Sequence, residues 1–110
     1  AYYSGIVKGG LEPYFRLGSS WGQMGGGLPP ANVPYNRTAL VDILLHTVRH
    51  YNEGWGGGEN FSSITKTQYW EVWNEPDGIP RFWNRSVDDF HVLIADAITT
   101  IKQYDTTLMV

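Results

Sequence analysis

Residues 68–76 read QYWEVWNEP, a run of aromatic and β-branched side chains that a proline closes. Such side chains fit the pleated surface of a strand, whereas proline is excluded from the interior of a sheet. The run therefore predicts a strand that ends near Asn74. Glu75 follows directly, so its carboxylate is expected at the carboxyl end of that strand.

Downstream of this strand the sequence predicts one helix and the start of another strand. Ser86 with Asp89 three residues later resembles a capping box, with aspartate in place of the usual glutamate or glutamine. One apolar face then continues to about Tyr104 and is formed by Phe90, Leu93, Ile94, Ala97, Ile98 and Ile101. Residues 106–110 are apolar enough at their end to predict a further strand.

Upstream the same alternation of helix and strand appears twice. Residues 1–8 have the apolar spacing of the last turns of a helix, and residues 13–18, PYFRLG, predict a short strand. A helix is expected from a cap at Asn36 to about Asn52, with apolar side chains at Leu40, Val41, Leu44, Leu45 and Val48. Glycine and proline mark the connections at 19–36 and 53–67 as loops.

This order of elements predicts βαβ units with a parallel sheet, an α/β fold class. Two architectures fit, an open doubly wound sheet and part of a (β/α)8 TIM barrel. The long loop after the first strand favours the barrel, whose functional face is built from such loops. A whole barrel needs about 250 residues, so 110 residues amount to less than half of one.

Composition excludes several classes of function. The chain has no cysteine, so it contains no disulfide, and no apolar run approaches the roughly 18 residues of a membrane span. The net charge is −3 and the basic residues are dispersed, which argues against a nucleic-acid partner. The chain starts without methionine and ends in an apolar run, so an internal fragment is expected.

Motifs for metals and cofactors are weak. His46 and His50 are four residues apart, but Thr47 stands where the zinc-protease pattern requires glutamate. The glycine clusters lack the lysine and hydroxyl residue of a phosphate loop, and no serine or cysteine nucleophile motif is present. We therefore expect neither a metal nor a cofactor.

Glu75 is the strongest catalytic candidate. A carboxylic acid at the carboxyl end of a barrel strand faces the mouth where barrel enzymes place their active sites. Glycoside cleavage requires such an acid to protonate the leaving oxygen, together with a second carboxylate across the sugar. The neighbouring Asn74 can donate a hydrogen bond to a sugar hydroxyl.

The block WEVWNEPD at residues 70–77, with Phe82 and Trp83 a few residues later, resembles the glycoside hydrolases of clan A and in particular family 39. That family includes β-xylosidases and α-L-iduronidases. The resemblance is dense over residues 68–110, looser over 9–52 and absent over 53–67.

The resemblance implies a retaining glycoside hydrolase with a carbohydrate substrate. By this resemblance, Glu75 is the general acid/base and Asn74 contacts the 2-hydroxyl of the sugar. Residues 1–110 would form a partial catalytic barrel domain, from about helix 2 to the start of strand 5. The nucleophile of the family is a glutamate near the end of the seventh strand, beyond Val110, so this chain alone is expected to be inactive.

Other aromatic and acidic residues near the expected site keep two interpretations each. Trp21 lies on the long loop, where it either stacks on a sugar or packs the loop, and Trp83 either lines the site or pins its loop. Trp73 either packs in the barrel, which we expect, or serves as a sugar platform. Glu71 shares strand parity with Trp73 and Glu75 and can point into the barrel. There we expect a buried, hydrogen-bonded structural carboxylate, and the alternative is a catalytic one.

Two further hypotheses about function stay open. One is a carbohydrate-binding relative that kept the barrel but lost the second carboxylate and is not catalytic. The other is a doubly wound α/β protein in which the motif is accidental.

Three triplets bear on location. Asn36, Asn60 and Asn84 each begin an Asn-X-Ser/Thr sequence, which predicts N-glycosylation and a secreted or lysosomal protein. The alternative is a bacterial protein without glycans, in which Asn36 and Asn84 are turn residues beside helices.

Overall fold

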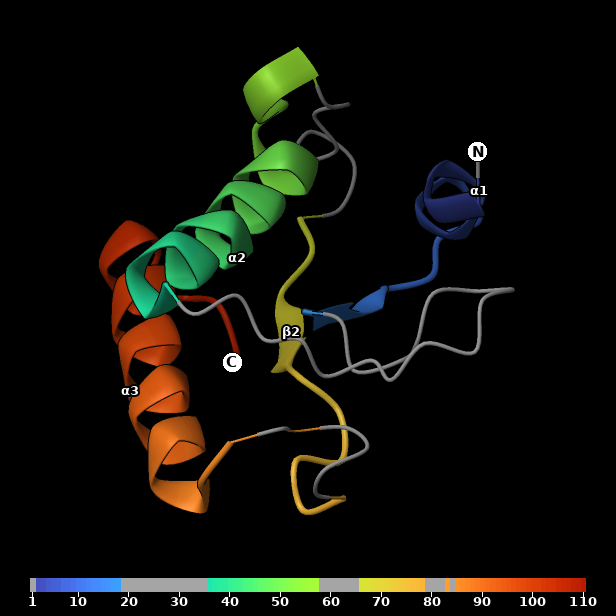
Figure 1. Cartoon of the computed structure of the whole chain (residues 1–110). Coiled ribbons are helices and arrows are strands. Elements are labelled where there is room, and N and C mark those ends of the chain that lie inside the picture. The colour runs from blue at the N-terminus through green and yellow to red at the C-terminus, as the bar shows by residue number, and fades with distance from the viewer. Residues whose placement is uncertain (1, 19–35, 58–65, 79–82, 84) are drawn as a thin grey trace.

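The computed structural model describes residues 2–18, 36–57, 66–78, 83 and 85–110 (Figure 1). The elements follow the predicted order of alternating helix and strand. They are α1 (Tyr2–Lys8), β1 (Tyr14–Leu17), α2 (Arg37–Asn52), the short 3-10 helix η1 (Trp55–Gly57), β2 (Tyr69–Val72) and α3 (Val87–Tyr104).

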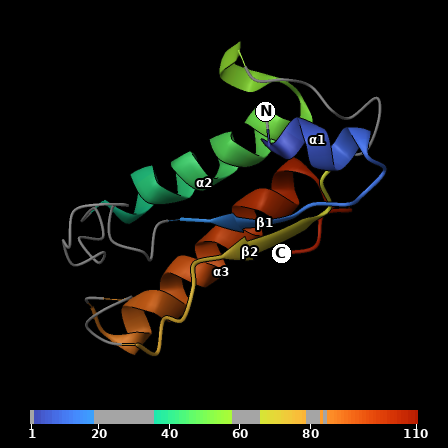
Figure 2. The same cartoon turned by 90° about the vertical axis from the view of Figure 1, so that its right-hand side faces the viewer.

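The strands β1 and β2 pair in parallel, with Phe15 opposite Trp70 and Leu17 opposite Val72 (Figure 2). On its other side β2 meets the C-terminal segment through a parallel bridge between Tyr69 and Met109. There the Trp70 amide donates to the Met109 carbonyl at 2.9 Å. The parallel sheet is thus confirmed, whereas the strand expected over 106–110 is reduced to this single bridge.

The α-helices α1, α2 and α3 cover one face of the two strands and follow one another around that face (Figure 1). The core on that face joins Leu17 and Trp70 to α2 and α3, through Leu40, Leu44 and Val48 of α2 and Leu93, Ala97 and Ile101 of α3. Among the described residues, no helix is long and apolar enough to cross a membrane.

A cluster of aromatic rings attaches α1 to this same face. Tyr3 of α1 packs edge-on against Phe15 at 5.9 Å and lies 4.5 Å from the ring of Tyr51 on α2. Phe15 in turn lies 5.2 Å from the ring of Trp70. The α-helices α1, α2 and α3 therefore pack on one side of the strands, an arrangement that is compatible with a segment of a (β/α)8 barrel.

The opposite face of the strands, which we call the open face, carries Tyr14, Arg16, Tyr69 and Glu71. Successive side chains of a strand point to opposite faces, and these four are the alternates of the core residues. The side chains of Tyr14 and Tyr69 are 67% and 41% exposed. The open face thus presents two exposed aromatic side chains beside the ion pair of Arg16 and Glu71.

Both predicted helix caps are present. The side-chain oxygen of Asn36 accepts the Ala39 amide at 3.0 Å, and that of Ser86 accepts the Asp89 amide at 3.0 Å. The Asp89 carboxylate accepts the Ser86 hydroxyl at 2.9 Å. Each cap satisfies an amide that the first turn of a helix leaves without a partner.

Asn52 at the end of α2 holds the chain that leads into β2. Its side chain is 3% exposed, and its amide nitrogen donates to the Thr67 carbonyl at 3.1 Å. The Thr67 amide donates back to the Asn52 side-chain oxygen at 3.0 Å. The sequence marked Asn52 only as the end of a helix, because nothing local indicates a partner so far along the chain.

We predict that Asn52→Ala lowers the free energy of unfolding by about 2 kcal/mol, since it leaves the buried Thr67 amide without a partner and removes the bond to its carbonyl. Chemical unfolding of the protein measures this effect. Asp42→Ala, on the exposed face of the same helix, is the control and should change stability by less than about 0.5 kcal/mol. Equal effects of the two variants would contradict the structural role of Asn52.

Asp105, directly after α3, is a carboxylate held by three donors. It accepts hydrogen bonds from the Lys66 ammonium group, from the Thr107 amide at 2.9 Å and from the Thr107 hydroxyl at 2.6 Å. The bond from Lys66, followed by those from Thr107, lowers the pKa of Asp105 from 3.8 to about 2. Because the folded-state pKa is depressed, the carboxylate stabilises the fold above about pH 4, and this stabilisation is lost as the pH falls towards 2.

The corresponding prediction concerns the pH dependence of unfolding. Asp105→Asn should lower the melting temperature at pH 6, and the difference from the wild type should shrink steadily between pH 4 and pH 2. Thermal melts over that range test this, with Asp42→Asn as an exposed control that leaves the pH profile unchanged. A difference that stays constant down to pH 2 would show that Asp105 acts through something other than its charge.

Candidate active site

The chain turns sharply where β2 ends, and the turn carries the candidate residues. Trp73 has φ 71° and Glu75 has φ 46°, both in the left-handed region that bulky residues rarely adopt. The amide of Gly78 closes the turn by donating to the Glu75 carbonyl at 3.0 Å. The strand therefore ends at Val72, two residues before the predicted end at Asn74.

This turn breaks the strand alternation that the sequence suggested. Glu71 lies on the open face, where its carboxylate accepts the Arg16 guanidinium at 2.7 Å across the two strands. Trp73 is instead buried in the core, so the prediction that both share one face was wrong. Glu71 is hydrogen-bonded as expected, but its side chain is half-buried and not fully enclosed.

Asn74 and Glu75 combine a buried amide with an exposed acid. The side chain of Asn74 is 7% exposed, and among the described residues its Nδ2 has no hydrogen-bond partner. A buried donor left in this state costs about 1 to 3 kcal/mol. A bound ligand with an acceptor, such as a hydroxyl oxygen, would satisfy this donor directly beside the exposed carboxylate of Glu75.

The end of β1 contacts this turn through Gly18. The Trp73 amide donates to the Leu17 carbonyl at 2.8 Å, which extends the pairing of the strands by one bond. Gly18 has φ 89°, and a Cβ atom at this position would lie 2.6 Å from Cε3 of Trp73. Only glycine therefore lets the Trp73 ring lie where it does.

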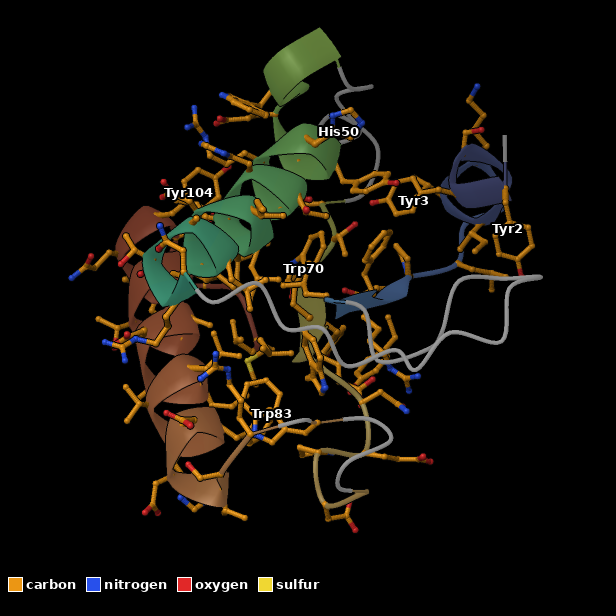
Figure 3. The ribbon with its side chains drawn as sticks, in the orientation of Figure 1. Tyr2, Tyr3, His50, Trp70, Trp83 and Tyr104 are labelled. Carbon is orange, nitrogen blue, oxygen red and sulfur yellow. The ribbon has the colours of Figure 1, made fainter. Side chains whose placement is uncertain are left out.

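The ring of Trp83, which is labelled in Figure 3, also contacts Trp73. The two indoles meet edge to face, with centroids 5.5 Å apart and planes at 86°. The Trp83 indole nitrogen donates to the Ser86 carbonyl at 2.8 Å, and the ring packs edge-on against Phe90 of α3 at 5.2 Å. This packing fixes the Trp83 ring in place, and a contact of Trp83 with a substrate stays a prediction.

The other candidates from the sequence divide into two groups. Trp21, Asn60 and Asn84 lie outside the described residues. Asn36 is exposed at the start of α2, with its side-chain oxygen engaged in the cap, and its glycosylation stays a prediction.

His46 and His50 both contact Trp55. The ring of His46 stacks on Trp55 with centroids 4.0 Å apart, and Nδ1 of His50 donates to the Trp55 carbonyl at 2.9 Å. Within the described part of the chain, no group of three or more histidine, aspartate or glutamate residues is placed to hold a metal ion.

The fold matches part of a solved glucosidase. The crystal structure of a glucosidase from Croceicoccus marinus aligns with 97% of this chain at a TM-score of 0.70 and 23% sequence identity. The chain spans 21% of the length of that glucosidase chain. No family model matches the sequence, and a search of curated proteins finds no match. The likeness establishes that the described elements are arranged as in a segment of a glucosidase.

The contact between Gly18 and Trp73 generates a prediction about stability. Gly18→Ala should lower the free energy of unfolding by about 2 to 4 kcal/mol, because it adds a steric clash to the cost of a left-handed alanine. Gly10→Ala is the matched control, since Gly10 has φ 76° but open space around its Cβ position. It should cost only about 1 kcal/mol. Chemical unfolding of both variants tests this, and equal losses would contradict the clash.

Proposed function

We propose that this chain is part of a retaining glycoside hydrolase in which Glu75 is the general acid/base. The observation that carries the proposal lies at the carboxyl end of a parallel strand, where the exposed carboxylate of Glu75 follows the buried amide of Asn74, and no other described residue satisfies that amide. The alignment with a segment of a glucosidase supports it.

In the first step, protonated Glu75 gives its proton to the glycosidic oxygen as the bond from that oxygen to the anomeric carbon breaks. A carboxylate supplied from outside residues 1–110 forms a bond to the same carbon, and the leaving group departs as an alcohol. In retaining enzymes the two carboxyl groups lie about 5 to 5.5 Å apart.

In the second step, ionised Glu75 removes a proton from water. The water oxygen bonds to the anomeric carbon while the bond to the nucleophile breaks, so the sugar is released with its original configuration. The exposure of Glu75 suits this double role, because the side chain must meet both the leaving group and a water molecule.

Asn74 is the proposed sugar-binding residue, with its Nδ2 donating to the 2-hydroxyl. A site built around a buried donor discriminates strongly against a ligand that lacks the acceptor, because the donor is then left unpaired. The resemblance of residues 70–77 to family 39 supports a xyloside or an iduronide as the substrate class.

The test is Glu75→Ala in the full-length protein, with kcat/KM measured on glycosides of poor and of good leaving groups. We expect a loss of about 1000-fold for an alkyl glycoside, since the departing alkoxide needs a proton. A dinitrophenyl glycoside should lose less than about tenfold, because its leaving group departs unprotonated. Asp77→Ala, an exposed carboxylate two residues along the same turn, is the control and should leave the ratio unchanged.

Equal losses for both substrates would contradict the role of Glu75. Azide provides a check on stereochemistry, because it attacks the glycosyl-enzyme without general-base assistance. It should accelerate turnover of the dinitrophenyl glycoside by Glu75→Ala and yield a glycosyl azide of retained configuration. A wild-type protein that binds sugars through Asn74 but hydrolyses none would instead be the non-catalytic relative.

A further inference from the structure

We propose that Trp83 and Gly18 are positioning residues that set the orientation of the Asn74–Glu75 pair, with the Trp73 ring as the link between them. This inference rests on the proposed function of Glu75. The contact between Trp73 and Trp83 then affects catalysis indirectly, because neither residue touches the substrate.

The turn after β2 is strained, so the surrounding structure must hold its conformation. Left-handed φ angles at Trp73 and Glu75 flank Asn74 on both sides. Backbone in such regions persists only where surrounding structure imposes it. Relaxation at either residue would swing the Asn74 amide and the Glu75 carboxylate away from their present directions.

The contacts of the Trp73 side chain impose this conformation. The Trp73 ring lies against the backbone of Gly18, where even a Cβ atom would approach Cε3 to 2.6 Å. The same ring meets Trp83 edge to face, with centroids 5.5 Å apart. The side chain of Trp73 is therefore in contact with both the end of β1 and Trp83.

Trp83 is itself fixed to a rigid element. Its ring is 2% exposed and packs against Phe90, and its indole N–H is bonded to the carbonyl of Ser86, the cap of α3. Through Trp83 the start of α3 therefore sets the position of Trp73, and through Trp73 that of the acid. A displacement of about 1 Å at a reacting group costs about 100-fold in rate.

The chain offers a matched pair of variants. Trp83 and Trp70 are equally buried, at 2% exposed each, and each donates one indole hydrogen bond to a backbone carbonyl, at 2.8 and 3.0 Å. Trp70 packs against Phe15 on the helix-covered face of the strands. Replacement of either by phenylalanine thus removes the same bond and similar volume, but only Trp83→Phe loosens the contact with Trp73.

In the full-length protein, Trp83→Phe should lower kcat/KM for the alkyl glycoside by about tenfold and for the dinitrophenyl glycoside by less than about twofold. Trp70→Phe should lower the melting temperature as much as Trp83→Phe does, and it should change kcat/KM for both substrates by the same factor. Gly18→Ala displaces Trp73 through a second, separate contact and should reproduce the leaving-group dependence of Trp83→Phe, with Gly10→Ala as its control. It also replaces Trp83→Phe as the test if that variant does not fold.

The inference is overturned if Trp83→Phe and Gly18→Ala lower kcat/KM by the same factor for both substrates, as Trp70→Phe does. Trp83 would then be a purely structural residue. The proposed function would then still stand on the leaving-group dependence of Glu75→Ala. If Glu75→Ala itself lowers kcat/KM equally for both substrates, the proposed function fails and the inference fails with it. The Glu75→Ala measurement therefore distinguishes the two failures.

Discussion

The parallel pairing of β1 with β2 brings the carboxyl ends of two strands to one edge, and every feature of the candidate site depends on it. The register opposes Leu17 to Val72, so the next residues, Gly18 and Trp73, meet where the strands end. The pairing is stable because α2 and α3 bury one face of the strands, including Trp70 and Leu17. The contact between Trp73 and Gly18, where the two strands end, therefore depends on this burial of one face.

The site concentrates unfavourable features in a short turn. It contains two left-handed residues, Trp73 and Glu75, and between them the buried amide donor of Asn74, for which the described part of the chain supplies no partner. Such features lower stability, and they persist because packing elsewhere offsets them. The edge-to-face contact of Trp73 with Trp83 and the cap of α3 provide that packing. A strained turn with a buried polar group beside an exposed acid is what the proposed function of Glu75 and Asn74 requires.

Sequence reasoning succeeded where the relevant interactions are short-range. Both helix caps, at Asn36 and Ser86, follow from residues three positions apart, and the order of elements follows from apolar spacing. It failed at the end of β2, because strand propensity continues through Trp73 while the backbone turns there. It also missed the two bonds of Asn52 to Thr67, since partners separated by a loop leave no local pattern.

The sequence by itself determined the elements, their α/β order and the chemistry available at Glu75 and Asn74, because these depend on residue type and on near neighbours along the chain. The tertiary structure decided which side of the strands is buried, where β2 ends, and that Asn74 is buried while Glu75 is exposed. At the end of β2 it also brings Trp73 into contact with Gly18 and Trp83, which come from separate parts of the chain. Contacts of this kind exist only after the strands have paired, so no reading of the local pattern contains them.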